Sequence, residues 1–243
     1  MIIAIDAGNS RIKWGLHDGA GWRDSGVLAT ADVTWLSEAA DEWPAGAPVV
    51  VCNVAGAGIA ENIRALLAAR HPRLSFLHAT AAACGVRNRY ASPAQLGADR
   101  WAALIGARAL QTGSCLVVCA GTATTVDLLD ADGVFRGGLI LPGLALMRAA
   151  LASGTAQLPL SAGQFSSEPR NTADAITSGC LYAQLGAVER AFAGIASEPG
   201  AHCLLTGGAA GELAAHLKVP CRLVDNLILD GLVRFAAAQG NTV

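Results

Sequence analysis

The segment DAGNSRIKWG, from Asp6 to Gly15, decides the fold of this chain. It follows the apolar run Ile2–Ile5 and continues into Arg11–Leu16, which predicts two strands joined by a turn at Ala7–Ser10. A second segment of the same plan, CAGTATTVD at Cys119–Asp127, lies roughly half a chain later, and LTGGAAG at Leu205–Gly211 lies near the end. This order and repetition indicate two related α/β halves that face one nucleotide.

Hydrophobic periodicity places the other elements. We expect further strands at Val49–Asn53, Cys115–Cys119, Thr124–Leu129, Phe135–Leu139, Cys203–Thr206 and Arg222–Val224. Helices are expected at Gly58–Arg70, Asp99–Leu110, Gly143–Ala152, Asn171–Phe192, Ala209–Leu217 and Leu227–Ala238. The join between the halves is expected near Gly113, so that residues 1–112 form an N-terminal domain and residues 113–243 a C-terminal domain.

Composition limits the class of protein. Apolar residues make up 53% of the 243 residues, but Gly, Pro or Arg interrupts the apolar stretches, so no membrane span is expected. A formal net charge of −2 without a basic run argues against nucleic acid as a partner. The seven cysteines contain no C-x-x-C pair and the five histidines show no ligand spacing, which argues against disulfides and structural zinc. The start lacks a secretion signal, and we expect a cytoplasmic protein that binds small molecules.

The turn DAGNS has two interpretations. A carboxylate at a strand end, Asp6, can hold hydrated Mg²⁺, while Gly8 lets backbone N–H groups approach phosphate oxygens and Asn9 and Ser10 donate hydrogen bonds. Lys13 could neutralise a phosphate. The alternative is an ordinary hairpin whose Gly-Asn turn needs left-handed backbone angles, with Asp6 bonding its own turn.

The other two glycine turns are weaker signals by themselves. At Gly121 and Thr122, hydroxyl groups could face the same phosphates, or the threonines could simply line the solvent face of a strand. Gly207 and Gly208 follow an apolar strand and precede a helix, which would let an adenine or ribose lie against the backbone.

The segment YASPAQLGADR, Tyr90 to Arg100, places Asp99 at the start of a predicted helix. Asp99 could be the helix N-cap, because aspartate is a favoured capping residue. It could instead be a general base that accepts a hydroxyl proton during phosphoryl transfer.

Taken together, these segments resemble the type III pantothenate kinase family of the acetate kinase, sugar kinase, Hsp70 and actin superfamily. DAGNS is similar to its D-x-G-N-[ST], and YASPAQLGADR to its Y-x-x-P-x-x-L-G-x-D-R. GTATTVDLLDADGVFRGGLILPG resembles its G-T-A-x-T-x-D segment followed by G-G-x-I-x-P-G, and NTADAITSG at Asn171–Gly179 fits as well. The resemblance spans nearly the whole chain.

The resemblance implies two ribonuclease H-like halves of the actin-like ATPase type with an ATP cleft between them. It also implies phosphorylation of pantothenate by ATP and Mg²⁺, the first step of coenzyme A biosynthesis, in a homodimer whose interface helps build the pantothenate pocket. By motif position, Asp99 would be the general base. ATP phosphates would be bound by Asp6 to Lys13 and by Thr122; pantothenate would be bound by Tyr90, Gly97, Ala98, Asp99, Arg100 and Thr172.

The chain departs from the family pattern at Cys119. The middle motif of the family begins with an aspartate, to which the resemblance assigns a bound monovalent cation, K⁺ or NH₄⁺. A neutral thiol is a poor ligand for a hard cation. We therefore expect an activity that does not respond to potassium.

Two other functions compete with this interpretation. One is another small-molecule kinase or phosphatase of the same superfamily, which the acceptor segment YASPAQLGADR argues against. The other is a regulator that kept the fold without catalysis, since fold does not fix function. The retention of Asp6, Asp99 and Thr122 argues against that second function.

Overall fold

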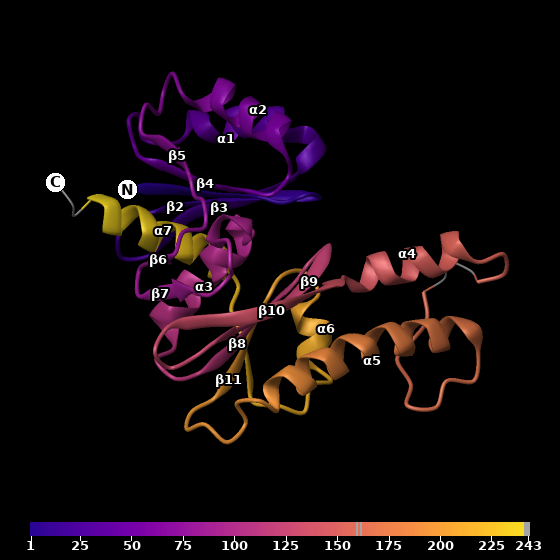
Figure 1. Cartoon of the computed structure of the whole chain (residues 1–243). Helices are drawn as coiled ribbons and strands as arrows, with labels where there is room; N and C mark the ends of the chain where they lie inside the picture. The colour runs from indigo at the N-terminus through magenta and orange to yellow at the C-terminus, as the bar shows by residue number, and fades with distance from the viewer. Residues whose placement is uncertain (159, 161, 241–243) are drawn as a thin grey trace. The chain divides into compact units, whose positions relative to one another are not determined.

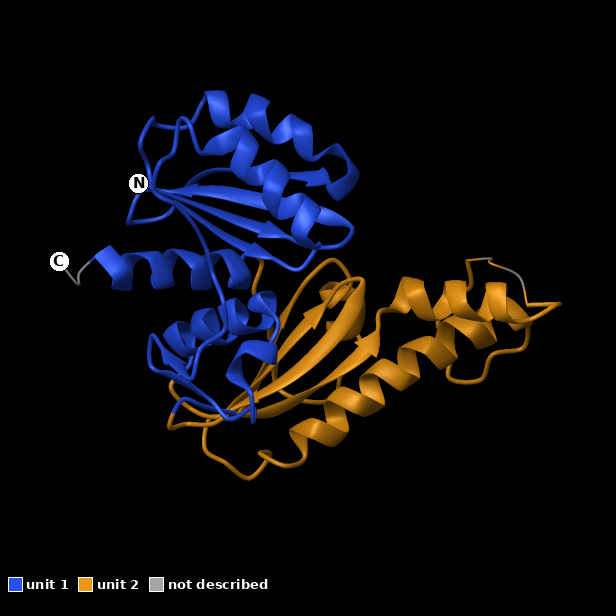
Figure 2. Cartoon of the chain, turned by 45° about the horizontal axis from the view of Figure 1, so that its top comes forward, with its two compact units in different colours: residues 1–111, 133–135, 226–243 blue, residues 112–132, 136–225 orange. Residues whose placement is uncertain are grey.

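The computed structural model describes residues 1–158, 160 and 162–240. Its contacts divide the chain into two compact units (Figure 2). Unit 1 comprises residues 1–111, 133–135 and 226–243, and unit 2 comprises residues 112–132 and 136–225. In the described residues no helix is long and apolar enough to cross a membrane.

The sheet of unit 1 has the strand order β3-β2-β1-β4-β5 (Figure 1). Its strands are β1 (Ile2–Ala7), β2 (Arg11–His17), β3 (Trp22–Ala29), β4 (Val49–Asn53) and β5 (Leu74–Phe76). The first three strands pair antiparallel, whereas β4 pairs parallel with both β1 and β5. The predicted hairpin is therefore confirmed, and β3 extends it by a strand that the sequence analysis did not predict.

The strands of unit 2 repeat this order as β10-β9-β8-β11-β12. They are β8 (Cys115–Ala120), β9 (Ala123–Leu129), β10 (Val134–Pro142), β11 (His202–Thr206) and β12 (Cys221–Leu223). As in unit 1, the first two strands in chain order pair antiparallel, and β11 pairs parallel with β8 and β12. The repetition seen in the sequence is thus a repetition of topology.

Helices cover the sheets. Unit 1 contains the 3₁₀ segments η1 (Thr30–Trp35) and η2 (Pro93–Gln95) and the helices α1 (Leu36–Asp41), α2 (Ala57–Leu67), α3 (Ala98–Leu110) and α7 (Leu227–Gly240). Unit 2 contains α4 (Leu144–Gly154), α5 (Thr172–Phe192) and α6 (Ala210–Ala214). Unit 1 also holds the short strands β6 (Ala82–Ala83) and β7 (Val86–Asn88); β7 pairs with Val134 and Phe135 at the start of β10. All six predicted helices are confirmed, within a few residues at their ends.

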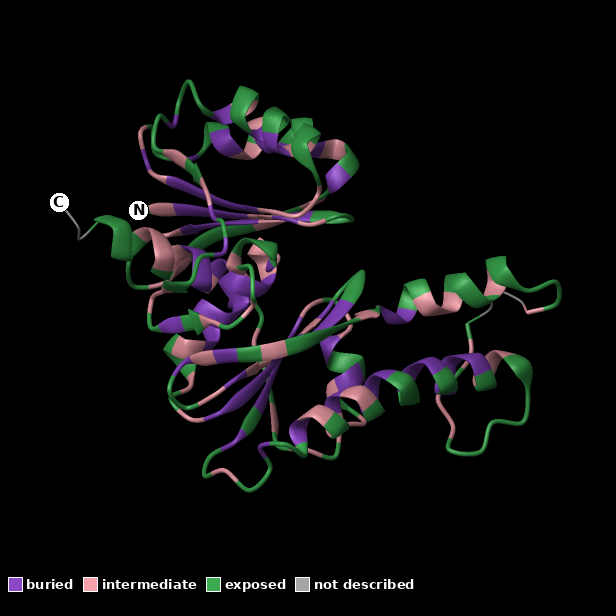
Figure 3. Ribbon diagram, viewed as in Figure 1, coloured by how far each residue is buried: buried purple, intermediate pink, exposed green. Residues whose placement is uncertain are grey.

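Each unit has its own apolar core (Figure 3). In unit 1, Ile3, Ile5 and Ala7 of β1 pack with Ile63 and Leu67 of α2. Side chains alternate across a strand, so the intervening residues Ala4 and Asp6 face the other side of the sheet. This places Asp6 on the face that is not covered by α2.

Helix α7 packs closely on α3 within unit 1. A Cβ atom on Gly106 would overlap the carbonyl oxygen of Leu227, and one on Gly231 would overlap that of Ala102. Glycine at both positions therefore permits the close approach. A hydrogen bond also connects α7 to β3, because Nε1 of Trp22 donates to Oδ1 of Asp230 at 2.9 Å. The chain thus returns to unit 1 at its C-terminal helix, and the boundary between the two domains at residue 112 stays a prediction.

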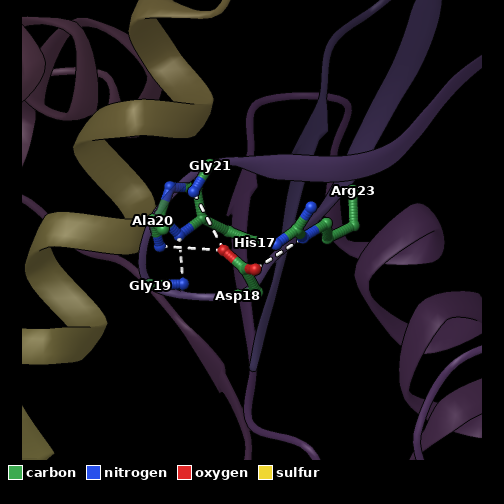
Figure 4. Close-up of polar contacts among 6 residues, drawn as sticks. All are labelled: His17, Asp18, Gly19, Ala20, Gly21 and Arg23. Atoms are coloured by element: carbon green, nitrogen blue, oxygen red, sulfur yellow. Dashed lines mark hydrogen bonds and ion pairs between the residues drawn. The ribbon is translucent and has the colours of Figure 1, made fainter.

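The turn between β2 and β3 is organised by Asp18 (Figure 4). Its Oδ1 accepts hydrogen bonds from the backbone N–H groups of Ala20 at 2.8 Å and Gly21 at 2.9 Å, and its Oδ2 pairs with Nε of Arg23 at 2.5 Å. These bonds, above all that from Ala20, lower the pKa of Asp18 to about 2. The turn thus sets the register of the unpredicted strand β3.

Candidate active site

Asp6 lies in a row of three side chains that crosses the sheet of unit 1. It is opposite Lys13 of β2 in the antiparallel pair and opposite Cys52 of β4 in the parallel pair. Residues directly opposite one another in a sheet point to the same face. Asp6 therefore has a cation on one side and a buried thiol on the other.

The pKa of Asp6 is raised from 3.8 to about 7. Burial is the largest cause, because it disfavours the charged carboxylate, and the carboxylate of Asp99 adds to it. Lys13 and a hydrogen bond from the Cys52 side chain act in the opposite direction. Asp6 and Asp99 are therefore close enough to interact electrostatically, although they lie on β1 and α3.

The turn after Asp6 is a tight hairpin. The N–H of Gly8 donates to the carbonyl of Arg11 at 3.0 Å, and Thr30 holds the turn by donating from Oγ1 to the carbonyl of Gly8 at 2.7 Å. A Cβ on Gly8 would lie 3.2 Å from the Arg11 carbonyl oxygen. In the described chain, neither Gly8 nor Asn9 has a positive φ, so the left-handed Gly-Asn turn was a wrong expectation. Asn9 and Ser10 are exposed.

Asp99 lies in the first turn of α3, and the N-cap is Gly97. The capping interpretation of Asp99 is therefore wrong. Its Oδ1 accepts the N–H of Arg100 at 2.8 Å, and a Cβ on Gly97 would come within 2.5 Å of that oxygen. Glycine at position 97 leaves room for the carboxylate, which stays partly exposed at the start of the helix beside Ala98.

Arg100 is only 4% exposed and lies between two aromatic rings. Its Nη1 donates to the hydroxyl of Tyr90 at 3.0 Å, and its guanidinium lies 5.7 Å from the centroids of both the Tyr90 and Phe135 rings. Such cation–π contacts hold a guanidinium in place without neutralising it. The side chain of Asn88 fixes the loop by accepting the N–H of Tyr90 at 3.0 Å. Tyr90 is therefore positioned by Arg100, not packed only as an apolar ring.

In unit 2, the turn at Gly121 and Thr122 follows β8. The N–H of Gly143 donates to the carbonyl of Thr122 at 2.9 Å, and a Cβ on Gly143 would overlap the carbonyl oxygen of Gly121. Thr122 is exposed, whereas Thr124 and Thr125 are 2% and 7% exposed. The expectation of solvent-facing threonines on this strand was wrong for these two residues.

Cys119 occupies the position in β8 that Asp6 occupies in β1. Its opposite residues are Thr125 of β9 and Thr206 of β11, both buried. This row holds a thiol and two hydroxyl groups, where the row of Asp6 holds a carboxylate and a cation. The donor chemistry of the row does not fit a monovalent-cation site built on a carboxylate.

The remaining predicted residues lie at the ends of elements in unit 2. Gly207 has φ +99°, and a Cβ there would overlap the carbonyl oxygen of Ala120, so only glycine fits; Gly208 is exposed. Thr172 is the exposed first residue of α5, whose N-cap is Asn171. The gathering of these residues around one nucleotide stays a prediction.

Two residues beside the candidate site, Cys52 and Phe135, belong to no motif of the sequence. Cys52 could have been found by pairing the predicted strand Val49–Asn53 in register with Ile2–Ala7, which brings it opposite Asp6. Phe135 was predicted as a strand residue, but its stacking with Tyr90, at 5.3 Å between ring centroids, depends on the pairing of β10 with β7. In the described residues no group of three or more His, Cys, Asp or Glu side chains could hold a metal ion.

The model of the family described as type III pantothenate kinase matches residues 2–194. A type III pantothenate kinase of Aromatoleum aromaticum is 57% identical over 232 residues, covering 96% of each chain. One from Dechloromonas aromatica is 50% identical, covering 97% of this chain and 99% of the relative.

Among solved structures, a candidate 2-dehydro-3-deoxygalactonokinase from Sinorhizobium meliloti superimposes with a TM-score of 0.66 at 21% identity, covering 98% of this chain and 99% of that one. MreB 5 of Spiroplasma citri bound to AMPPNP gives a TM-score of 0.52 at 10% identity, covering 99% and 97%. These likenesses show the fold, which is the predicted α/β fold of the actin and sugar kinase type.

Proposed function

The chain belongs to the type III pantothenate kinase family, and from this premise we propose which of its residues carry out the reaction. The chain is an enzyme that phosphorylates pantothenate in an ATP-dependent reaction of coenzyme A biosynthesis. The two competing functions, a different small-molecule kinase and a non-catalytic regulator, are not favoured, because relatives of the same description cover nearly the whole chain.

The match of residues 2–194 to the family model carries the proposal, and the charge of Asp99, which adds to burial in raising the pKa of Asp6, relates the two carboxylates. One carboxylate lies near the end of the first strand, and the other lies in the first turn of α3. Phosphoryl transfer needs a group that handles the phosphates and a base near the acceptor hydroxyl. We assign the first role to Asp6 and the second to Asp99.

In the proposed reaction, the primary hydroxyl of pantothenate attacks the γ-phosphorus of ATP. An oxygen–phosphorus bond forms, the bond from the γ-phosphorus to the bridging oxygen of ADP breaks, and the hydroxyl proton moves to the carboxylate of Asp99. The transition state of such transfers is loose, so positioning and charge neutralisation supply most of the acceleration. The base contributes on the order of 10²- to 10⁴-fold.

The hairpin from Asp6 to Lys13 is proposed to hold the ATP phosphates, through Gly8, Asn9, Ser10 and Lys13. The carboxylate of Asp6 fits hydrated Mg²⁺, because hard divalent cations prefer oxygen ligands and keep several waters. Bound there through water, Mg²⁺ would offset charge on the phosphate oxygens. From unit 2, Gly121 and Thr122 are proposed to add a phosphate contact, and Gly207 and Gly208 to accommodate the nucleoside.

Pantothenate is proposed to bind at the segment that precedes α3. Tyr90, Gly97, Ala98 and Arg100 surround Asp99 in sequence, and Arg100 and Tyr90 are already held together. Both can donate hydrogen bonds to a carboxylate. Thr172 is proposed to complete the pocket from a second copy of the chain in a homodimer. Unit 2 offers apolar surface for such an interface, since Leu139, Ile140 and Leu146 are 47%, 66% and 47% exposed.

A coupled assay for ADP release, run with and without pantothenate, tests the activity, and the same assay on Asp6→Asn tests the phosphate role. We expect ADP release that requires pantothenate, and a large loss of that release in the variant. An equal rate of ADP release without pantothenate would contradict pantothenate as the acceptor of the phosphoryl group. An unchanged rate in Asp6→Asn would remove Asp6 from the site while leaving the family assignment in place.

A further inference from the structure

Cys52 is the buried neighbour of Asp6 on the side away from Lys13. It is 0% exposed and lies opposite Asp6 in the parallel pairing of β1 with β4. Parallel pairing turns both side chains to the same face of the sheet. A hydrogen bond from the Cys52 side chain acts to lower the pKa of Asp6, against the larger effect of burial. The charged carboxylate is an acceptor only, so the thiol is the donor.

Two charged residues also act on Asp6. Lys13 attracts the carboxylate from β2, and Asp99 repels it from α3. A Coulomb attraction or repulsion acts on both carboxylate oxygens, so it does not by itself fix the rotation of the carboxyl group. A hydrogen bond from a residue held in a central strand acts on one oxygen and has a direction.

We infer that Cys52 is a positioning residue for the reaction: its thiol holds one oxygen of the Asp6 carboxylate and leaves the other turned toward the phosphate side. This inference rests on the proposed role of Asp6. A small donor is needed, because the site is fully buried between strand neighbours. A thiol fills it without the charge that a lysine or histidine would bring.

The test compares Cys52→Ala, which removes the donor, with Cys52→Ser, which keeps a donor of similar size. Loss of one modest hydrogen bond changes binding about three- to tenfold. We expect Cys52→Ala to raise the KM for MgATP, and the Mg²⁺ concentration for half-maximal rate, by that factor. The KM for pantothenate should stay within about twofold, and Cys52→Ser should restore most of the loss.

Val50→Ala is the matched control, because Val50 is 2% exposed and lies two residues earlier on the same face of β4. It removes packing without touching Asp6. If Val50→Ala raises the KM for MgATP as much as Cys52→Ala does, or if Cys52→Ser is no better than Cys52→Ala, the role of Cys52 is only to fill space and the inference is overturned.

A second readout does not depend on activity. The S–H stretching band of Cys52, obtained as the infrared difference between the wild-type protein and Cys52→Ser, should shift when Asp6 is changed to Asn. If the frequency of this band is the same in Asp6→Asn as in the wild-type protein, the inference is overturned, even if the KM values change as expected. Failure of the proposed role of Asp6 gives a distinguishable result. In that case Asp6→Asn would keep the wild-type rate, while the S–H band would still shift.

Discussion

Burial raises the pKa of Asp6, and the carboxylate of Asp99 raises it further, although Asp6 lies on β1 and Asp99 on α3, far apart in the chain. Two carboxylates that repel each other are costly for the fold. In the proposed function, Asp6 at the end of β1 holds Mg²⁺ through water, and Asp99 at the start of α3 accepts the proton.

Replacing Asp99 by Asn removes the proposed proton acceptor and leaves a group of similar shape. We expect kcat to fall at least about tenfold, as is typical for general bases, while the affinity for ATP stays nearly unchanged. Steady-state kinetics and nucleotide titration measure the two quantities. An unchanged turnover would take Asp99 out of its role.

The raised pKa of Asp6 makes stability depend on pH. The folded protein holds this proton up to about pH 7, whereas the unfolded chain releases it near 3.8, so folding is favoured below the lower value and loses stability as the pH rises to about 7. We expect Asp6→Asn to gain in Tm relative to wild type over this range, without nucleotide or Mg²⁺. The exposed Asp24→Asn is the control, and equal pH slopes for Asp6→Asn and wild type would contradict the prediction.

Replacing Tyr90 by Phe removes the hydroxyl that accepts from Arg100 and keeps the ring beside Phe135. Because one hydrogen bond contributes about 0.5–1.5 kcal/mol, we expect the KM for pantothenate to rise about two- to tenfold with little change in the KM for ATP. Tyr182→Phe, at a tyrosine that is 49% exposed, should behave as wild type. An equal rise in both KM values would instead indicate a general loss of structure.

Potassium should not activate the wild-type enzyme, because a thiol between two hydroxyl-bearing residues replaces the carboxylate. Rates in potassium, ammonium and sodium salts at equal ionic strength should agree within about twofold. We expect Cys119→Asp to introduce a preference for potassium. Several-fold potassium activation of the wild-type enzyme would show the prediction wrong.

A methyl group at Gly106 would overlap the backbone of α7. We expect Gly106→Ala to lower the free energy of unfolding by at least about 1–3 kcal/mol, the usual cost of overpacking. Gly58→Ala in α2 is the matched control, because nothing lies within 4 Å of its added Cβ and alanine favours helix. Chemical denaturation measures both, and equal stabilities of the two variants would contradict the close packing of α3 on α7.

The sequence by itself determined most of the longer elements and the family. Short apolar runs with glycine turns defined β1, β2, β4, β8 and β11, because strand alternation and turn chemistry are local properties. Strand β3 was missed, since its residues are mostly exposed and carry no apolar alternation. The places of Asp6 at a strand end and of Asp99 in the first turn of a helix were predicted for the same local reason, while their roles stay predictions.

Only the tertiary structure decided which side chains act on Asp6. The register of β1 with β4 brings Cys52 opposite it, and the packing of α3 brings the charge of Asp99. The return of α7 to unit 1 likewise depends on two glycines that meet across helices. These contacts join residues that are distant in the sequence. Their energies depend on burial and proximity in the folded chain, so a local sequence pattern cannot predict them.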